Sequence, residues 1–520
     1  MDRRDFLRSA GLTAAGVALL GPAAACSSTS GGTSAPTTAP TATESLDPAA
    51  WAALAASMTG RLVLPASPSY PTAILVYDLP YATAQPAAVA FCASPSDVQR
   101  CLAFARAHGV TPIPRSGGHS YGGYSTGTGL VVDTTAMDTV TATGGTAVIG
   151  AGTRLIDVYD QLSAAGVLIP AGSCPTVGVA GLTMGGGIGV VGRRYGLTCD
   201  NLQSLQVVTA DGSLLTADAS EHADLFWAHQ GGGGGNFGVV TSFTFTTHPA
   251  PGLALFTLDF PWSAAADVLG AWLDWAPGAP NEVWSNCQLL VESGTPTVRS
   301  AGVCVGSAGT LSSLLQPFLS AVGTAPTYNY VGPQTYLNAM LIEGGCEGLS
   351  VAQCHTPDQN PAGTLSRSSF AAKSAYVSAA PPSAGISAAV AGVQDLADQD
   401  PTLGGGLVFD AYGGAINTVT PAATAFVHRN ALCCIESSVS WTTTTPAATI
   451  SLGRQWLAQS ATTMAPYTDG GAYQNYIDPT LVNWQQAYYG ANLPRLSQVK
   501  TTYDPDGVFR FAQSIPGAAG

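Results

Sequence analysis

Charged side chains are scarce in this sequence of 520 residues. They make up 10% of the chain, against about 25% in an average protein, and Lys373 and Lys500 are its two lysines. Acidic residues outnumber Lys and Arg by 32 to 18, which gives a formal net charge of −14. Binding of nucleic acid requires clustered positive charge, so this composition argues against a nucleic-acid partner.

Long apolar runs and metal-binding patterns are also missing. No stretch reaches the about 18 apolar residues that a membrane-spanning helix needs. The 7 histidines are scattered and form no H-E-x-x-H pattern, and the 11 cysteines include no paired C-x-x-C. We therefore expect neither a transmembrane segment nor a metal site.

The N-terminus has the features of an export signal. Residues 1–26 contain paired arginines, Arg3 and Arg4, before a mildly apolar run, which is typical of a twin-arginine signal. We expect an exported protein, extracellular or at the cell surface, with the export machinery as a partner. Small residues before Cys26 also resemble a lipoprotein cleavage site, which leaves a lipid anchor open. The Ser/Thr/Pro/Gly-rich residues 27–46 predict a disordered linker.

An exported chain can form disulfides. Cys346 and Cys354 flank a short segment and are predicted to form a local bridge, whereas the adjacent Cys433 and Cys434 are predicted to pack inside a strand.

The length and the residue patterns predict a protein with two domains. A Ser/Asp start and a glycine stop predict a helix over 95–108, and Asp211-Gly212 predicts a hairpin turn. Helices and strands alternate irregularly, which indicates the α+β class. The segment 251–459 is richer in Ala/Ser-rich helical stretches, with strands predicted near 403–409 and 431–441, and is interpreted as an inserted domain.

Two short motifs match enzyme signatures in the wrong context. Residues 118–122 spell G-x-S-x-G, the nucleophile elbow of serine hydrolases, but glycines on both sides disfavour the helix that must follow the serine, by about 1 kcal/mol each. Residues 187–192 spell G-x-G-x-x-G with Asp211 downstream, but a loop rather than a strand is predicted before them. Neither a serine hydrolase nor a Rossmann domain is favoured.

Three glycine-rich loops together indicate a binding site for a ligand that carries a pyrophosphate. They are "RSGGHSYGG" at 115–123, "CPTVGVAGLTMGGGIG" at 174–189 and "GGGGGNFGVV" at 231–240. Each offers backbone N–H groups with little side-chain bulk, as a pyrophosphate-bearing ligand requires where it passes close to the main chain.

These loops belong to a longer ordered set of motifs that includes "DLFWAHQGGGGGNFGVVTSF", "YGGAINTVTPAATAFVHRNAL", "AYQNYID" and "RLSQVKTTYDPDGVFRFAQSIP". The set resembles the berberine-bridge-enzyme-like branch of the vanillyl-alcohol-oxidase (PCMH-type) flavoproteins. The resemblance implies an α+β fold with a two-subdomain FAD-binding domain over 47–250. A substrate domain on an antiparallel sheet would occupy 251–459, and the C-terminal segment 460–520 would complete the FAD domain.

The resemblance also implies that FAD is attached twice, through His119 to the 8α-methyl group and through Cys174 to carbon 6 of the flavin. Neutral imidazole and thiolate are suitable nucleophiles near neutral pH. Leu182 stands where family members often carry a histidine that stabilises the reduced flavin, so backbone dipoles would contribute more here. The further residues implied to line FAD are Arg115, Ser116, Gly117, Gly118, Ser120, Val177, Gly178, Gly181, Gly185, Gly186, Gly187, Gly189, Asn236, Gly238, Val240 and Asn475.

Removal of a hydroxyl proton needs a base near the flavin. The residues that match the family's active site are Tyr473, Tyr476, Tyr121 and Glu436, with Tyr412 and Asp410 as weaker matches. We predict Tyr473 as the base, because "YQNY" is the more specific match, with Tyr476 in support and Glu436 orienting the substrate. An exchange of roles between Tyr473 and Glu436 is the alternative.

The resemblance thus implies an FAD-dependent oxidase that acts on an alcohol group of a carbohydrate or a hydroxylated secondary metabolite and reduces O2 to H2O2. Val177 matches a family position beside the oxygen-reacting carbon, where valine is typical of the oxidases. A dehydrogenase with another acceptor and an exported flavin carrier without a substrate are the alternatives.

Overall fold

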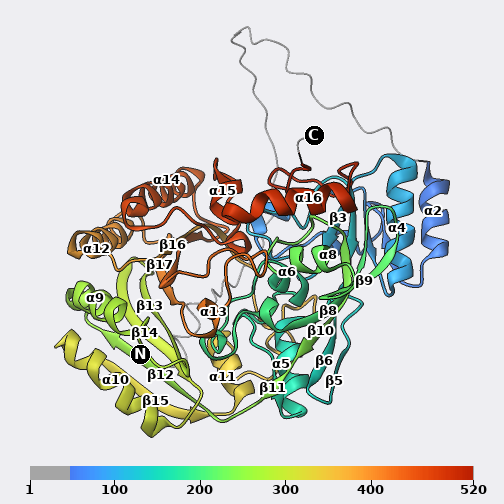
Figure 1. Ribbon diagram of the computed structural model, residues 1–520. Coiled ribbons are helices and arrows are strands. Elements are labelled where there is room, and N and C mark those ends of the chain that lie inside the picture. The colour runs from blue at the N-terminus through green and yellow to red at the C-terminus, as the bar shows by residue number, and fades with distance from the viewer. Residues whose placement is uncertain (1–46, 519–520) are drawn as a thin grey trace, which may run out of the picture.

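The protein is described here by a computed structural model that covers residues 47–518. The predicted signal over 1–26, the linker over 27–46 and Cys26 lie outside the described residues. Figure 1 shows mixed helices and sheets in two halves, and the predicted α+β class is confirmed. We refer to the half formed by 47–250 as the N-terminal domain and to the half formed by 251–459 as the central domain.

The N-terminal domain begins with a four-stranded sheet of order β1-β2-β4-β3, in which β2, β4 and β3 are parallel. The predicted helix 95–108 is present as α4, where the Ser94 hydroxyl accepts a hydrogen bond from Asp97 N and Gly109 ends the helix at φ +65°. The elements of this subdomain are α2 (Pro48–Ser57), β1 (Arg61–Val63), α3 (Tyr70–Ala73), β2 (Ala88–Phe91), α4 (Pro95–His108), β3 (Pro112–Arg115) and β4 (Leu130–Asp133).

The second subdomain is a five-stranded antiparallel sheet of order β5-β6-β10-β8-β9. The predicted hairpin is confirmed, since β8 pairs with β9 and Gly212 takes φ +88° in the turn. Its elements are β5 (Val140–Thr143), β6 (Thr146–Gly150), α5 (Leu155–Ala164), β7 (Val167–Leu168), α6 (Val179–Met184), α7 (Gly192–Tyr195), β8 (Leu202–Val208), β9 (Leu214–Asp218), α8 (Ala223–Ala228), β10 (Val239–Thr246) and β11 (His248–Pro249).

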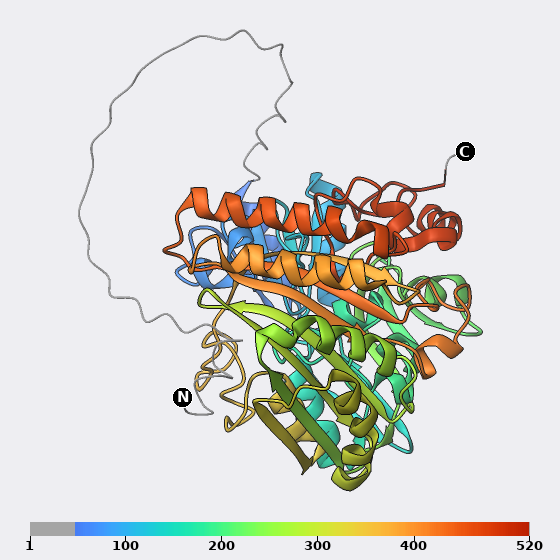
Figure 2. The same ribbon diagram turned by 90° about the vertical axis from the view of Figure 1, so that its left-hand side faces the viewer.

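A seven-stranded antiparallel sheet of order β15-β12-β14-β13-β17-β18-β16 forms the central domain. Helices α9, α10, α12 and α14 cover one face, and the opposite face turns toward the N-terminal domain (Figures 1 and 2). The strands are β12 (Leu253–Phe260), β13 (Val283–Glu292), β14 (Thr295–Cys304), β15 (Tyr328–Gln334), β16 (Ser369–Val377), β17 (Gly404–Ala411) and β18 (Cys433–Trp441). The helices are α9 (Ala265–Trp275), α10 (Ala308–Val322), α11 (Tyr336–Glu343), α12 (Ser383–Ala397), α13 (Ala415–Thr418) and α14 (Ala447–Met464).

The sequence pattern had indicated only two strands in 251–459, near 403–409 and 431–441, and both are present as β17 and β18. Five further strands were missed. The strand β12, "LALFTLDF", is almost entirely buried, and a short continuous apolar run cannot be distinguished from a buried helix by periodicity alone.

The chain then returns to the N-terminal domain. The helices α15 (Trp484–Tyr489) and α16 (Leu493–Tyr503) follow, and α16 packs against α8. Lys500 is buried there, and its Nζ donates to Asn236 O at 2.7 Å and to Phe509 O at 2.6 Å. The C-terminal segment is therefore joined to the third glycine-rich loop.

Both cysteine predictions are confirmed. Cys346 and Cys354 form a disulfide, and Cys433 and Cys434 are buried in β18.

Among residues 47–518, no helix is long and apolar enough to cross a membrane, and within the same range no cluster of His, Cys, Asp and Glu is suited to hold a metal ion.

A buried ion pair links the two domains. Arg429 is 1% exposed and donates from Nη1 and Nη2 to both carboxylate oxygens of Asp200, at 2.8 and 2.6 Å. Nη2 also donates to Thr424 Oγ1 at 2.8 Å. Removal of one partner of such a pair leaves the other as an uncompensated buried charge.

We therefore expect Arg429→Met to lower the free energy of unfolding by about 3–5 kcal/mol, measured from denaturation midpoints in urea. Arg194→Met is the matched control, because the Arg194–Glu282 pair is 46% and 38% exposed and exposed pairs contribute about 0–1 kcal/mol. Equal losses in the two variants would contradict this role of Arg429.

Candidate functional site

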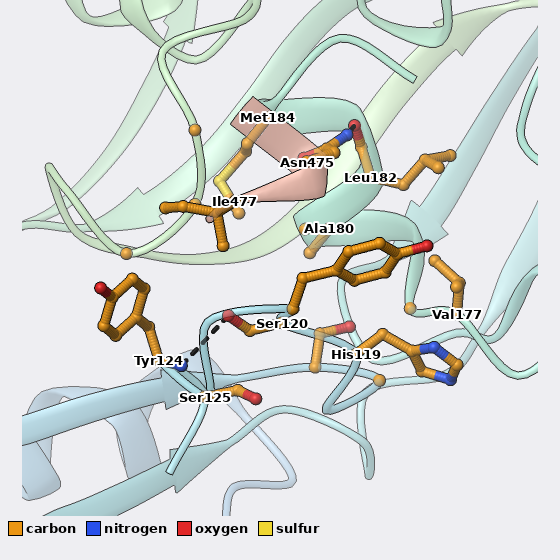
Figure 3. A pocket seen from close by; sticks show the side chains of 18 of the residues that line it. His119, Ser120, Tyr124, Ser125, Val177, Ala180, Leu182, Met184, Asn475 and Ile477 are labelled. Atoms are coloured by element: carbon orange, nitrogen blue, oxygen red, sulfur yellow. Dashed lines mark hydrogen bonds between the residues drawn. The ribbon is translucent and has the colours of Figure 1, made fainter. Parts of the chain in front are cut away.

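A cavity of about 650 Å³ lies where the two domains meet. Its walls come from the three glycine-rich loops, from β13, β17 and β18 of the central sheet, and from the segment 473–477. In Figure 3, His119 and Val177 lie at one end and Tyr124 and Ser125 at the other. The three loops predicted to act together are thus brought to one cavity.

Close backbone approach explains the glycines between the first two loops. A Cβ on Gly117 would lie 2.1 Å from Gly178 N, and a Cβ on Gly178 would lie 2.1 Å from Ser116 Oγ. Any larger residue at either position would push the loops apart, and these loops carry His119 and Cys174.

His119 is held in a fixed orientation as a neutral imidazole. Its ring stacks on Tyr77 with centroids 3.9 Å apart, and Nε2 lies 2.9 Å from Thr176 Oγ1. Burial, together with nearby arginine charges, lowers the pKa of His119 to about 3. A neutral imidazole keeps the lone pair that an attachment to carbon requires.

Cys174 lies on the second loop and also lines the cavity. Of the eight free cysteines within the described part of the chain, it is the only exposed one, and seven are buried. Desolvation and then the negative charges of Glu436 and Asp410 raise the pKa of its thiol to about 11. The surrounding negative charge disfavours the thiolate expected from the sequence, so a covalent attachment there requires a proton acceptor.

The cavity walls fit a long nucleotide-bearing cofactor. Gly181 lines the cavity, and a Cβ at this position would meet no atom within 4 Å. Three buried polar atoms of lining residues, Arg115 Nη1, Ser125 Oγ and Thr126 Oγ1, have no hydrogen-bond partner among residues 47–518. Such donors suit phosphate and ribose oxygens, and the glycine loops leave room beside them.

Most residues predicted to hold FAD line this cavity. They are Arg115, Ser116, Gly117, Gly118, His119, Ser120, Cys174, Val177, Gly178, Gly181, Leu182, Gly189, Asn236, Gly238, Val240 and Asn475.

Gly185, Gly186 and Gly187 do not line the cavity. Cβ atoms at Gly185 and Gly186 would clash with Asn475 and Phe426 respectively. At Gly185 and Gly186 these neighbouring side chains leave no room for a Cβ, which explains why glycine is needed there.

A carboxyl group lies among tyrosines at the sheet side of the cavity. Glu436 Oε1 accepts a hydrogen bond from Tyr121 Oη at 3.1 Å, and the ring of Tyr476 stacks on Tyr121 with centroids 5.2 Å apart. Burial raises the pKa of Glu436 to about 7, although the hydroxyls of Tyr121 and Tyr476 lower it. Burial and the charge of Glu436 raise the pKa of Asp410 to about 7 as well.

Tyr473, the predicted base, is buried, and its hydroxyl lies against backbone and amide donors. Its hydroxyl oxygen accepts hydrogen bonds from Gly187 N at 3.0 Å, Ile188 N at 3.4 Å and Asn475 Nδ2 at 2.9 Å. Burial raises its pKa well above that of free tyrosine. The geometry therefore favours Glu436 over Tyr473 as proton acceptor. Tyr412, a weaker match, is buried outside the cavity lining with its hydroxyl 3.1 Å from that of Tyr376.

Four polar or aromatic lining residues were missed in the sequence. Trp284, Asn286 and Gln288 alternate along β13, so they lie on one face of the sheet. Glu343 ends α11 and lines the same region. The alternation in "VWSNCQLLVE" was the available signal, but this stretch was not recognised as a strand.

Comparison with known proteins agrees with this arrangement. Residues 86–218 match the family model described as "FAD binding domain", and residues 472–516 match the one described as "Berberine and berberine like".

Similar proteins cover nearly the whole chain. The uncharacterized FAD-linked oxidoreductase YgaK of Bacillus subtilis is 34% identical over 88% of this chain and 97% of its own. The xylooligosaccharide oxidase of Thermothelomyces thermophilus is 30% identical over 85% of this chain and 88% of its own. The structure of Physcomitrella patens BBE-like 1 has a TM-score of 0.82 at 31% identity and covers 90% of this chain and 100% of that one. This chain belongs to the berberine-bridge-enzyme-like FAD-linked oxidases of the PCMH superfamily, which are oxidoreductases acting on CH–OH groups.

Proposed function

We propose that this protein is an exported oxidase whose FAD is bound covalently at both His119 and Cys174, and that it oxidises an alcohol group and reduces O2 to H2O2. The observation that carries the proposal is the cavity itself, which brings His119, Cys174 and the Glu436 carboxyl to one site. When bound, FAD accepts a hydride from the substrate carbon and passes the two electrons to oxygen.

The proposed substrate class is a carbohydrate, with a hydroxylated secondary metabolite as the second possibility. Relatives of this chain include oligosaccharide oxidases by name. The cavity also offers paired polar groups on one strand face, since Gln288 Nε2 donates to Asn286 Oδ1 at 3.2 Å. Such amide pairs are suited to bind vicinal hydroxyl groups.

We assign Glu436 as the group that accepts the proton of the substrate hydroxyl. An acceptor should titrate near the working pH, and the Glu436 carboxyl does so because burial raises its pKa to about 7. Tyr121 donates to Glu436 and holds it in place, and the ring of Tyr476 stacks on Tyr121. The Tyr473 hydroxyl instead accepts hydrogen bonds from the backbone N–H groups of Gly187 and Ile188 and so holds this loop in place.

The alternatives are a dehydrogenase and a flavin carrier without its own substrate. Val177 lines the cavity beside His119 (Figure 3) and supports the oxidase, because a small side chain leaves space for oxygen. The Glu436–Tyr121–Tyr476 group supports an enzyme over a carrier, since a carrier needs no proton acceptor. Export by the twin-arginine route, with or without a lipid on Cys26, rests on residues 1–26 and stays part of the proposal.

Covalent attachment predicts that acid-precipitated, washed protein stays yellow and that a digest yields one flavin joined to two peptides. His119→Ala and Cys174→Ala should each keep the flavin through the remaining bond, while the double variant should release it on denaturation. Cys304→Ala is the control, because Cys304 is a buried free cysteine outside the cavity lining. Colourless pellets from flavin-loaded wild-type protein would refute bicovalent attachment.

The oxidase assignment predicts fast reoxidation by air. Photoreduced protein mixed with aerated buffer should reoxidise rapidly and form peroxide, and a screen of sugars and other alcohols that reads peroxide should identify substrates. Val177→Leu should slow reoxidation strongly, while the rate of flavin reduction changes little. Slow reoxidation of wild-type protein, with turnover restored by an artificial acceptor, would instead indicate a dehydrogenase.

The assignment of Glu436 as base predicts a loss of about 10²–10⁴-fold in the rate of flavin reduction for Glu436→Gln, with flavin content retained. Tyr473→Phe should lose less. Because only the ionised carboxyl accepts a proton and its pKa is about 7, kcat/KM on a neutral substrate should fall as the pH drops through about 7. Rapid-reaction kinetics test both points, and the opposite order of the two variants would return the role to Tyr473.

A further inference from the structure

We propose that the cavity selects an alcohol that carries a protonated amine close to the carbon that is oxidised, with Glu343 and Asp410 as the groups that bind the ammonium. This inference rests on the proposed oxidation of a carbohydrate and names its class, an amino sugar.

Three carboxyl groups converge on the substrate side of the cavity. Asn286 on β13 pairs with Asp410 on β17, and Val408 on β17 pairs with Glu436 on β18. Alternation along the strands places Asp410 and Glu436 on the same face of the sheet, and both line the cavity. Glu343 reaches the same region from the end of α11.

Within the described range, no ion pair joins Glu343, Asp410 or Glu436 to a basic side chain. The basic residues that line it are Arg115, His119 and Arg510, of which Arg115 pairs with Asp133 at 2.5 Å and His119 is neutral. The cation that acts on Glu343 is Arg299, which binds both oxygens of Asp259 at 2.5 and 3.0 Å.

The pKa values of these buried carboxyls are raised mainly by burial. Burial raises the pKa of Glu343 to about 7, although Arg299 lowers it. Burial, then Glu436 and also Glu343 raise the pKa of Asp410, although the neighbouring Asn286 side chain lowers it. An ammonium group placed among these carboxyls would favour their ionised forms.

An unsatisfied donor in the same wall also indicates a ligand. Trp284 is 6% exposed, lies on the same strand face as Asn286 and Gln288, and lines the cavity. Its Nε1 has no hydrogen-bond partner in the part of the chain that the structure describes. A buried indole N–H normally finds an acceptor, and a hydroxyl oxygen of a sugar would supply one.

Together these groups discriminate between sugars by charge. A neutral sugar satisfies Trp284, Asn286 and Gln288 but leaves three carboxyls crowded without a cation. An amino sugar satisfies the same groups and adds the countercharge. It also lowers the pKa of the neighbouring Glu436 in the complex, which keeps the proposed proton acceptor ionised at lower pH.

The test compares three β-1,4-linked oligosaccharide series of equal length that differ only at carbon 2 of each ring, which carries a hydroxyl, an acetamido or an ammonium group. With the holoenzyme at about pH 6, where the amine is protonated, kcat/KM for the ammonium series should exceed that for the other two at least about tenfold, equivalent to about 1.4 kcal/mol. The acid limb of the kcat profile should lie at lower pH for this series than for the hydroxyl series, because kcat reports the enzyme–substrate complex.

Glu343→Gln should reduce the ratio of kcat/KM between the ammonium and hydroxyl series at least about fivefold. Glu292→Gln is the matched control, because burial also raises the pKa of Glu292 near Arg299 while Glu292 lies outside the cavity lining. The control should leave the ratio unchanged.

Equal or better oxidation of the hydroxyl or acetamido series would overturn the amine inference while leaving the carbohydrate oxidase intact. Failure of all three series to be oxidised would overturn the inference as well. In that case, peroxide formation with other alcohols would still support the proposed oxidase function. If no alcohol gave peroxide, the proposed function itself would be overturned. An unchanged ratio in Glu343→Gln would exclude Glu343 from recognition.

Discussion

The hydroxyl of Tyr473 is the contact on which the geometry of the cavity depends. It accepts hydrogen bonds from the backbone of the 185–189 loop and from Asn475, and the Tyr473 backbone N donates to Ser374 Oγ on β16 at 2.9 Å. One residue of the C-terminal segment thus ties a loop of the N-terminal domain to the central sheet. Asn475 Nδ2 extends this link to Leu182 O at 3.0 Å.

The two domains that Tyr473 connects contribute chemically different groups to the same cavity. The loops of the N-terminal domain bring His119 and Cys174 close to backbone N–H groups and exclude side-chain bulk. The central sheet brings carboxyl, amide and indole groups of β13, β17 and β18 together on one face of the sheet. In the proposed function, the first set holds the cofactor rigidly while the second binds the substrate and receives its proton, so variation of the sheet face changes specificity without changes in the cofactor site.

The sequence predicted the loops well and the sheet poorly, for a physical reason. Glycines at close backbone contacts and the caps of α4 are local signals, and the resemblance fixed their order, so His119 and Cys174 were placed at one cavity correctly. The strands β12, β15 and β16 pair with segments far away in the chain, which leaves little local signal, whereas β13 and β14 form a local hairpin whose alternation was not recognised. The role of Tyr473 depended on donors 286 residues away in the chain, and the surroundings of Glu436 depended on Tyr121, 315 residues away.

The central claim is that Glu436 receives the substrate proton beside a flavin held by the loops. Infrared difference spectroscopy between oxidised and substrate-reduced protein, recorded without oxygen at about pH 8, measures this directly, because the Glu436 carboxyl begins ionised above its pKa of about 7. The account predicts that a protonated-carboxyl band appears on reduction, shifts in heavy water and is absent from Glu436→Gln. Absence of the band in wild-type protein, or its persistence in the variant, would contradict the account.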